Sequence, residues 1–451
     1  MTVPAGRLKL FFLPRTFPIG IRMNWCGSMK TDTVGRMVVT DKTDLNKRRV
    51  SLQHVEVLAG EGVMGKVERW LGGRLKDIRG FIEGLYEHDL HAKRVDALAG
   101  ATLGVMTSAS LAVAVIGQAL AQARGLVTKH AIKQVDRLLS NQNIDVWDSF
   151  ARWVPHLIGA RKEIVVAVDW TEFDRDGQAT LALNLVTGHG RATPLLWVTV
   201  WKEELTDQRN DFEDACLLRL KQLVPPDCAV TVLADRGFGD HKLFKFLDDL
   251  GFGYVIRFRG NIHVTDADGE TRPAADWVGK SGRARKLRGA QVTASHAYKV
   301  GAVVCVHAKA MKEPWCLAVS NAEASTAMQV NYYAKRWTIE PNFRDTKDLR
   351  FGMGLGATRI GEPTRRDRLL LINAFAMVLL TMLGAAGESL GMDRLLKSNT
   401  SKIRTHSLFR QGCMLYELIP TMPDQRLFPL MARFAETVSK CRSFSGLFEV
   451  I

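Results

Sequence analysis

The sequence predicts an α/β fold in which a mixed sheet is flanked by helices and preceded by a helical region. The first observation is a run of three β-branched, apolar segments from residue 164 onward, a pattern typical of an antiparallel meander. The second is the alternation of helical and strand patterns that follows, which favours helices packed against a mixed sheet. The third is the helical spacing of apolar residues between about 52 and 158.

The elements of the sheet follow one another in a definite order. The three first strands are "EIVVAVD", which ends at Asp169, then "ATLALNLV" and "ATPLLWVTVW". A helix over about 210–223 precedes the strand "CAVTVLAD", which ends at Asp235. The helix "HKLFKFLDDLG" and the strand "GYVIRFR" complete the series. We therefore place the sheet region at 159–390, and a helical C-terminal region at 391–451.

Composition narrows the class of partner. A chain of 451 residues buries a large core and is long enough for two or three domains. Its 62 Lys and Arg against 47 Asp and Glu give a net charge of +15, which points to a polyanion, most commonly nucleic acid. The seven cysteines are scattered without a C-x-x-C pair, which indicates reduced thiols in the cytoplasm and argues against a disulfide framework or a zinc cluster.

The N-terminal third divides into two segments. Residues 1–50 are basic and weakly patterned, and the regular pattern begins only at Met37, so the sequence leaves open whether residues 1–36 belong to the native protein. Residues 51–158 are helical and are a candidate DNA-binding region.

Within this region the sequence predicts two helices joined at Gly125, with Thr128 as the N-cap of the second. A helix-turn-helix would present Lys129, Lys133 and Arg137 to DNA. A helical hairpin with a solvated basic face fits the same residues equally well.

Two apolar stretches have almost the length of a membrane span. Residues 99–120 are rich in Ala, Gly and Ser, and residues 369–387 follow the basic run "RRDR" and contain Asn373 and Thr381. We interpret the second stretch as a helix buried in a large core. The N-terminus shows no apolar segment with a small-residue cleavage site, which argues against a secretory signal.

A β-rich insertion is expected between the last strand of the series and the next helix, over about 259–325. It contains the basic loop "GKSGRARKLRG", in which five cations occupy nine positions, and like charges so close together favour an anionic partner. A solvated loop is the alternative. The predicted nucleic-acid contacts in this loop are Lys280, Arg283, Arg285, Lys286 and Arg288.

Three acids form a candidate metal site. Asp169 and Asp235 each end an apolar strand, a rigid place from which to project a carboxylate into a cleft. With the isolated Glu340 they supply the hard oxygen ligands that suit Mg²⁺ or Mn²⁺. Two such ions about 3.5–4 Å apart activate an attacking water and stabilise the leaving oxygen in phosphoryl transfer.

The stretch "NYYAKRWTIEPNFRDTK" surrounds Glu340 with cations. On a helix of about 100° per residue, Tyr333, Arg336, Glu340 and Lys347 fall within a stripe about 60° wide. By the same arithmetic Arg344 lies on the edge of that stripe, and a helix of this kind presents one carboxylate among groups that grip a phosphate backbone. Pro341 predicts a kink at this point, because proline removes a backbone donor and disfavours helical geometry at the preceding residue.

These residues resemble the signature of a known family. The spacing Tyr333-x2-Arg336-x3-Glu340-x6-Lys347 is similar to the Y-R-E-K signature of insertion-sequence family four DDE transposases. "VDWTEF" resembles the first-aspartate block of that family and "LADRGFGD" the second. The blocks occur in the same order as in the family, and the long gap between the second and third acids fits the β-strand insertion of the family. The resemblance extends over roughly 130–420.

The resemblance implies an RNase H-like catalytic core with Asp169, Asp235 and Glu340 as the triad that binds Mg²⁺, for which Mn²⁺ substitutes. Tyr333, Arg336 and Lys347 would hold phosphates of the transposon end, and Arg236 would contact DNA. A list of predicted DNA contacts then also includes Arg344 and the five cations of the basic loop.

It further implies a bacterial, cytoplasmic enzyme, nucleoid-associated when bound to DNA, that performs DNA recombination as part of a mobile element. Such enzymes act as homodimers that pair two double-stranded ends with terminal inverted repeats. They cut the ends, through a hairpin in the better-studied members, and join them to target DNA. Some members stack a flipped base on a tryptophan of the insertion, for which Trp277 is a candidate, although we favour an ordinary half-buried tryptophan.

Three other functions are consistent with parts of the sequence. "GEGVMGKV" has the glycine and lysine spacing of a P-loop, but Val67 stands where an ATPase needs a hydroxyl for Mg²⁺. A catalytically inactive, transposase-derived DNA-binding protein would have the same overall pattern, although all three acids are retained. A nuclease with the same core would cut without joining strands. The repeat sequence, the target preference, the use of a hairpin and the present activity of the element are not encoded in any pattern that we find.

Overall fold

The computed structural model describes residues 29–31, 37–39, 75–293, 295–309 and 311–443, with side chains as far as residue 440. The chain divides into one unit over Met1–Met64 and another over Gly65–Ile451. In the first unit the described residues form the antiparallel pair β1 (Met29–Thr31) and β2 (Met37–Val39). The remaining predictions for residues 1–74, including the P-loop-like stretch, lie outside the described residues.

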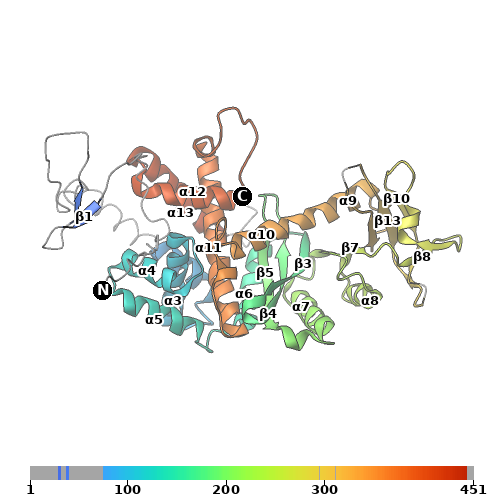
Figure 1. The fold of residues 1–451 in the computed structure, drawn as a ribbon, viewed down its shortest axis with the longest axis horizontal. Helices are drawn as coiled ribbons and strands as arrows, with labels where there is room; N and C mark the ends of the chain where they lie inside the picture. Colours follow the sequence, from blue (N-terminus) through green and yellow to red (C-terminus); the bar gives the residue numbers. More distant parts are fainter. Residues whose placement is uncertain (1–28, 32–36, 40–74, 294, 310, 444–451) are drawn as a thin grey trace, which may run out of the picture. The chain divides into compact units, whose positions relative to one another are not determined.

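The second unit is built on an eight-stranded mixed sheet with the order β10-β13-β14-β7-β6-β3-β4-β5 (Figure 1). The predicted meander is confirmed, because β3, β4 and β5 pair antiparallel in sequence order. On the other side of β3, β6 and β7 add parallel strands. The bounds of these five strands are β3 Glu163–Phe173, β4 Gln178–Leu185, β5 Thr193–Trp201, β6 Ala229–Ala234 and β7 Gly253–Phe258.

The segment between β7 and the next long helix is made of short strands. Three of them, β14, β13 and β10, continue the main sheet antiparallel beyond β7, and four form a separate small sheet of order β12-β11-β8-β9. The predicted basic loop is therefore partly wrong, because its second half is the edge strand β10. The strands are β8 His263–Thr265, β9 Thr271–Pro273, β10 Arg285–Arg288, β11 Gln291–Val292, β12 Tyr298–Lys299, β13 Ala302–Val306 and β14 Trp315–Val319.

Helices cover the sheet and form the rest of the core. The predicted helices before β6 and β7 are confirmed as α7 and α8. The helices are a segment over 75–86, α3 Ala92–Ser108, α4 Val113–Arg124, α5 Thr128–Leu139, α6 Val146–Ile158, α7 Arg209–Leu223, α8 His241–Asp249, α9 Thr326–Lys335, α10 Ile339–Lys347, α11 Pro363–Ser389, α12 Leu408–Leu418 and α13 Asp424–Ser443. A mixed α/β unit of this kind, with an eight-stranded sheet and flanking helices, fits an RNase H-like domain.

The helix α11 lies at the centre of this unit and contacts α3, α12 and the edge strand β5 (Figure 1). It is long and apolar enough to cross a membrane, with a mean hydropathy of 2.3, but 89% of its most apolar window is buried within the protein. This burial fits the interpretation of residues 369–387 as a core helix. Close packing needs glycine here, since a Cβ on Gly412 of α12 would lie 1.8 Å from the carbonyl oxygen of Leu380.

The helical region before the sheet differs in two respects from the prediction of one helix that ends at Gly125 and a second that is capped by Thr128. Residues 102–125 are two helices, because the chain leaves α3 at Ala109, which has a left-handed φ of 47°, and α4 runs at 98° to α3. Gly125 ends α4 in the left-handed conformation, as expected for a C-cap glycine. Thr128 is the first helical residue of α5, and Val127 occupies the N-cap position, so the predicted cap is wrong by one residue.

Candidate active site

The two aspartates lie side by side on neighbouring strands. The parallel pairing of β3 with β6 ends at Val168 and Ala234, so Asp169 and Asp235 both follow the last paired position. The prediction that Asp169 ends its strand is wrong, since β3 continues to Phe173 through its pairing with β4. Only the pairing with β6 ends there, and both carboxylates therefore project from the same edge of the parallel pair.

The turn after β6 holds Asp235 in place. The backbone N–H of Gly237 donates to Asp235 Oδ1 at 2.8 Å. Gly239 lies so close to β7 that a Cβ there would be 2.6 Å from Cβ of Phe258. The glycines of "LADRGFGD" are thus explained by the close approach of this turn to its neighbours.

Glu340 reaches the site from the first turn of α10, and Arg336 connects it to the sheet. The guanidinium of Arg336 donates to Asp169 Oδ2 at 3.4 Å and to Glu340 Oε1 at 3.1 Å. Arg336 is buried, in the short 3-10 turn Arg336–Thr338 that separates α9 from α10. This break confirms the predicted irregularity near Pro341, whose ring and missing N–H disturb the preceding turn.

The carboxylates repel one another, and the effect is visible at Asp169. Burial raises the pKa of Asp169 to about 6, and the negative charge of Asp235 adds to the rise. Arg336 opposes it, and Glu340 adds a smaller repulsion. A divalent cation would relieve this repulsion, and carboxylate oxygens are the donors that Mg²⁺ and Mn²⁺ prefer.

The donor set and its charge therefore fit a divalent metal ion. The geometry is not that of a closed site, because within the described part of the chain no three His, Cys, Asp or Glu side chains are grouped closely enough to hold an ion. Arg336 lies between Asp169 and Glu340 instead. The guanidinium of Arg336 thus occupies the position between these acids where a bound metal ion would be expected.

The other two residues of the predicted stripe, Lys347 and Tyr333, lie in different surroundings. Lys347 Nζ donates to Thr171 Oγ1 at 3.1 Å and to the carbonyl oxygen of Glu172 at 2.5 Å, which fastens the end of α10 to β3. Tyr333 is only 2% exposed and packs edge-on against Trp315 at 4.8 Å. Its ring centre lies 5.9 Å from the guanidinium carbon of Arg336, so Tyr333 stays beside the residue that bridges the acids, whereas Lys347 contacts β3.

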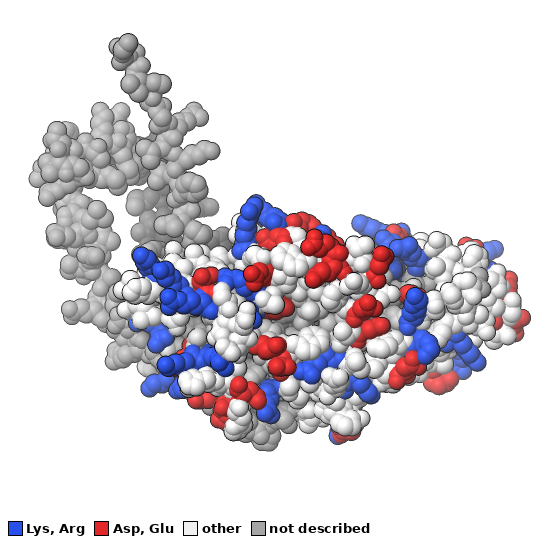
Figure 2. Space-filling view, turned by 90° about the horizontal axis from the view of Figure 1, so that it is seen from below, with Lys and Arg blue, Asp and Glu red and all other residues white. Residues whose placement is uncertain are grey.

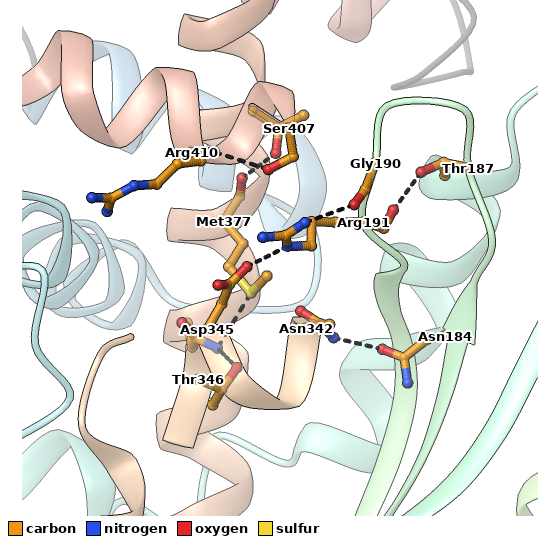
Figure 3. Close-up of polar contacts among 12 residues, drawn as sticks. Asn184, Thr187, Gly190, Arg191, Asn342, Asp345, Thr346, Met377, Ser407 and Arg410 are labelled. Carbon is orange, nitrogen blue, oxygen red and sulfur yellow. Dashed lines mark hydrogen bonds and ion pairs between the residues drawn. The ribbon is translucent and has the colours of Figure 1, made fainter. Parts of the chain in front are cut away.

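The face of α10 opposite the acids is held by a buried polar network (Figure 3). Asn342 Nδ2 donates to Asn184 Oδ1 on β4 at 3.0 Å. Asp345 accepts a hydrogen bond from Nε of Arg191 at 2.5 Å, and Arg191 lies in the loop between β4 and β5. Asn373 of α11 donates to Thr346 Oγ1 at 3.3 Å. Three neighbouring elements thus fix the rotation of the helix that presents Glu340.

Arg236 connects the site to the insertion. Its guanidinium pairs with Glu313 at 3.0 Å, and Arg257 of β7 pairs with the same carboxylate at 2.7 Å. The predicted DNA contact of Arg236 is compatible with its exposed position but is not tested by it.

The five cations of the predicted basic loop do not share one face. Arg285 lies over the ring of Trp277 at 5.0 Å, and Arg288 pairs with Glu323 at 3.3 Å. Lys286 Nζ is bound by the carbonyl oxygens of Ala322 and Ala324. Because alternate residues of β10 point to opposite faces, the cluster is split, although Lys280 and Arg283 are exposed before the strand. Their contact with nucleic acid stays a prediction.

Trp277 is fully buried, and its indole N–H donates to the carbonyl oxygen of Val264 at 3.2 Å. It therefore forms part of the core of the insertion, which fits the ordinary interpretation of this residue better than base stacking.

In the helical region before the sheet, Lys129, Lys133 and Arg137 are all exposed on α5. Both interpretations of these helices, a DNA-binding helix-turn-helix and a hairpin with a solvated basic face, therefore stay open.

The net positive charge is not gathered on the face in Figure 2, where Lys and Arg alternate with Asp and Glu. A part of the surplus lies in the segment before residue 75, where the sequence is basic. Overall charge therefore does not by itself locate a binding surface.

Two residues near the site were missed by the sequence analysis. Trp337 is exposed directly after Arg336, whose guanidinium lies 5.8 Å from its ring. Glu213 of α7 accepts from the indole N–H of Trp170 at 2.8 Å, and burial raises the pKa of Glu213 to about 7. The position of Trp337 inside the cationic stretch was a usable signal, whereas nothing in the helical pattern marks Glu213.

Comparison with known families gives one match. Residues 160–379 match the family model described as "Transposase DDE domain". The matched region begins just before β3 and ends within α11, so it includes all three acids and the insertion. No protein in a curated collection matches the chain. The family match supports a DDE transposase, an enzyme class that acts on DNA and generally uses divalent metal ions.

Proposed function

We propose that this protein is a cut-and-paste transposase that cuts DNA at the ends of an insertion sequence and joins the ends to target DNA. The observation that carries the proposal is the placement of three acids from separate elements in one region: Asp169 and Asp235 follow the paired parts of adjacent parallel strands, and Arg336 ties Glu340 to Asp169. The Y-R-E-K spacing supports placing it in insertion-sequence family four. We further propose that it acts in the bacterial cytoplasm, as a homodimer on two inverted repeats.

Asp169, Asp235 and Glu340 would hold Mg²⁺, or Mn²⁺ in its place. When bound, such ions activate an attacking water and stabilise the leaving oxygen of the cut strand. Arg336 is the group that must change partners. While it bridges two of the acids it neutralises them, and it is placed to grip a DNA phosphate once the acids converge.

The remaining residues position these groups. Lys347 ties α10 to β3, and the network of Asn342, Asp345 and Thr346 fixes the opposite face of the helix. Buried, mutually hydrogen-bonded supports of this kind hold an active-site group to within a fraction of an ångström.

The test is Mg²⁺- or Mn²⁺-dependent cleavage and strand joining on DNA that carries the inverted repeats flanking the reading frame. Wild type is compared with Asp169→Ala, Asp235→Ala and Glu340→Ala. Glu163→Ala is the matched control, because Glu163 is an exposed acid on the same strand as Asp169. We expect the three variants to bind the ends without cutting or joining, and the control to act as wild type.

Three other outcomes would overturn the proposal. A wild-type protein that binds the ends in the presence of metal but never cuts them is a transposase-derived DNA-binding protein. Triad variants that cut as well as wild type would show that the catalytic core lies elsewhere. Cutting without joining would identify a nuclease.

A further inference from the structure

A tip of exposed apolar residues follows the helix that presents Glu340. The helix α10 ends at Lys347, and the chain then turns at residues 349–351, which we call the tip. Leu349 is 74% exposed and Phe351 is 55% exposed. Two neighbouring large apolar side chains in water are unfavourable unless a partner covers them.

The tip has a fixed shape of its own. Asp348 Oδ1 accepts the backbone N–H groups of Arg350 at 2.8 Å and of Phe351 at 2.6 Å. Gly352 then packs on the end of α10, where a Cβ would lie 2.4 Å from the carbonyl oxygens of Arg344 and Asp345. The exposed side chains are therefore presented by a pre-formed turn, which reduces the entropy lost on binding.

Two unpaired cations flank the tip. The guanidinium carbons of Arg344 and Arg350 each lie 5.0 Å from the centre of the Phe351 ring. The nearby carboxylates are already engaged, Asp345 by Arg191 and Asp348 by the two backbone amides. Among the described residues no acid lies within ion-pair distance of either arginine. Apolar side chains between unpaired guanidinium groups match a partner with both stacked bases and phosphates, which is DNA.

The position of the tip agrees with that partner. At about 1.5 Å per residue, the seven residues from Glu340 to Lys347 span roughly 10 Å along α10. At about 3.4 Å per base pair, this distance corresponds to roughly three or four base pairs of duplex. A DNA strand that runs along α10 with a phosphate at the acids would therefore pass the tip a few base pairs away.

We propose that the tip is a wedge that enters the DNA a few base pairs from the bond to be cut. Leu349 inserts beside the bases and unstacks one step, while Arg344 and Arg350 hold the phosphates on either side. The proposal rests on the proposed function for the identity of the DNA, but unstacking itself needs neither metal nor cleavage. Inserted apolar side chains of this kind cost a few kcal/mol of stacking, which the added phosphate contacts offset.

The experiment places 2-aminopurine, whose fluorescence rises on unstacking, at successive positions within about six base pairs of the cleaved bond. The full chain is bound to this DNA without divalent metal. Leu349→Ser and Phe351→Ser are the test variants. Ile403→Ser and Phe428→Ser are the matched controls, because these residues are 76% and 66% exposed on other parts of the surface.

We expect wild type and both controls to raise the fluorescence several-fold at one or two adjacent positions. The tip variants should bind the DNA, retain their thermal unfolding temperature and lose most of the fluorescence rise. In the presence of metal, a mismatch placed at the responding step should restore cutting by Leu349→Ser.

The proposal is overturned if wild type gives no rise at any position, or if the tip variants give the wild-type rise. It is also overturned if the tip variants change the oligomeric state by light scattering, because the tip then covers a second copy of the chain. Failure of the proposed function gives a different result. If the wild-type protein unstacks DNA but never cuts it, the wedge proposal is supported and the proposal of a transposase is rejected.

Discussion

The buried face of α10 and the exposed end of this helix differ in whether their side chains are bound by polar partners. On the buried face, Asp345 is bound by Arg191, Asn342 by Asn184 and Thr346 by Asn373 (Figure 3). At the exposed end, Arg344 and Arg350 lie over the ring of Phe351, and no acid in the described part of the chain forms an ion pair with either of them. Paired groups in the interior serve the fold, whereas unpaired cations on a rigid turn are available to a ligand. The predictions below test this difference.

The largest effect is expected from Arg191→Leu. It leaves the carboxylate of Asp345 without its partner in a place where burial already raises the pKa of that group. Breaking one side of such a pair costs about 3 kcal/mol. Chemical denaturation should show this loss in the free energy of unfolding. The double variant Arg191→Leu with Asp345→Leu should recover most of it, and a double variant as unstable as the single one would contradict the argument.

A buried ring nitrogen that finds no hydrogen-bond partner among the described residues, Nε2 of His156, should make stability respond to pH. Burial lowers the pKa of His156 to about 4, and its ring packs edge-on against Phe81 at 6.0 Å. Because the unfolded chain takes up the proton near pH 6.5, the stability from neutral His156 is complete above that pH and is lost as the pH falls toward 4.

We therefore expect wild type to lose roughly 2 kcal/mol between pH 7 and pH 5 through this group, measured by denaturant titration at each pH. The variant His156→Phe should lack that part of the slope. An identical pH dependence in the variant would show that His156 does not control it.

The amide pair gives a smaller effect. In the described part of the chain, Asn342 and Asn184 share one hydrogen bond, while Asn184 Nδ2 and Asn342 Oδ1 have no partner. Asn342→Leu should destabilise the protein by about 1.5 kcal/mol, because it leaves Asn184 unpaired in the interior. Replacing both asparagines by leucine should cost less than either single change, as measured in a double-mutant cycle.

The smallest effect on stability is expected at the exposed end. Arg350→Ala should change the free energy of unfolding by less than about 0.5 kcal/mol. The same variant should reduce the slope of log affinity against log salt concentration by about 1, since one phosphate contact is lost. A stability loss comparable to that of Arg191→Leu would show that Arg350 supports the fold as the buried residues do, and would contradict the difference drawn between the two ends of α10.

Local patterns predicted the sheet well because its strands are continuous apolar runs. The meander, the later strands of the mixed sheet and the two aspartates that follow apolar segments were all predicted from such runs. The end of β3 was misplaced because Asp169 was taken as a terminator, whereas the alternation in "WTEF" continues the ladder with β4. A polar residue such as Asp169 can lie inside a strand where that strand is paired with only one neighbour, here β4.

The errors elsewhere come from tertiary contacts that no local pattern encodes. The break between α3 and α4 occurs without proline or glycine, and it depends on Gly104 lying against the backbone of Ile116. The split of the basic cluster follows from β10 joining the sheet, which the charge pattern concealed. The contact of Lys347 with Thr171 of β3 joins residues that are 176 positions apart in the sequence.

The extension of the sheet by β14, β13 and β10 has a consequence for how the protein could be shortened. Without these strands, the unpaired N–H and C=O groups of β7 would face solvent next to the second aspartate. An open edge of that kind recruits other chains and leads to aggregation. A trimmed enzyme for use as a DNA-insertion tool would therefore need to retain β14, or to replace it with a charged or proline-containing edge.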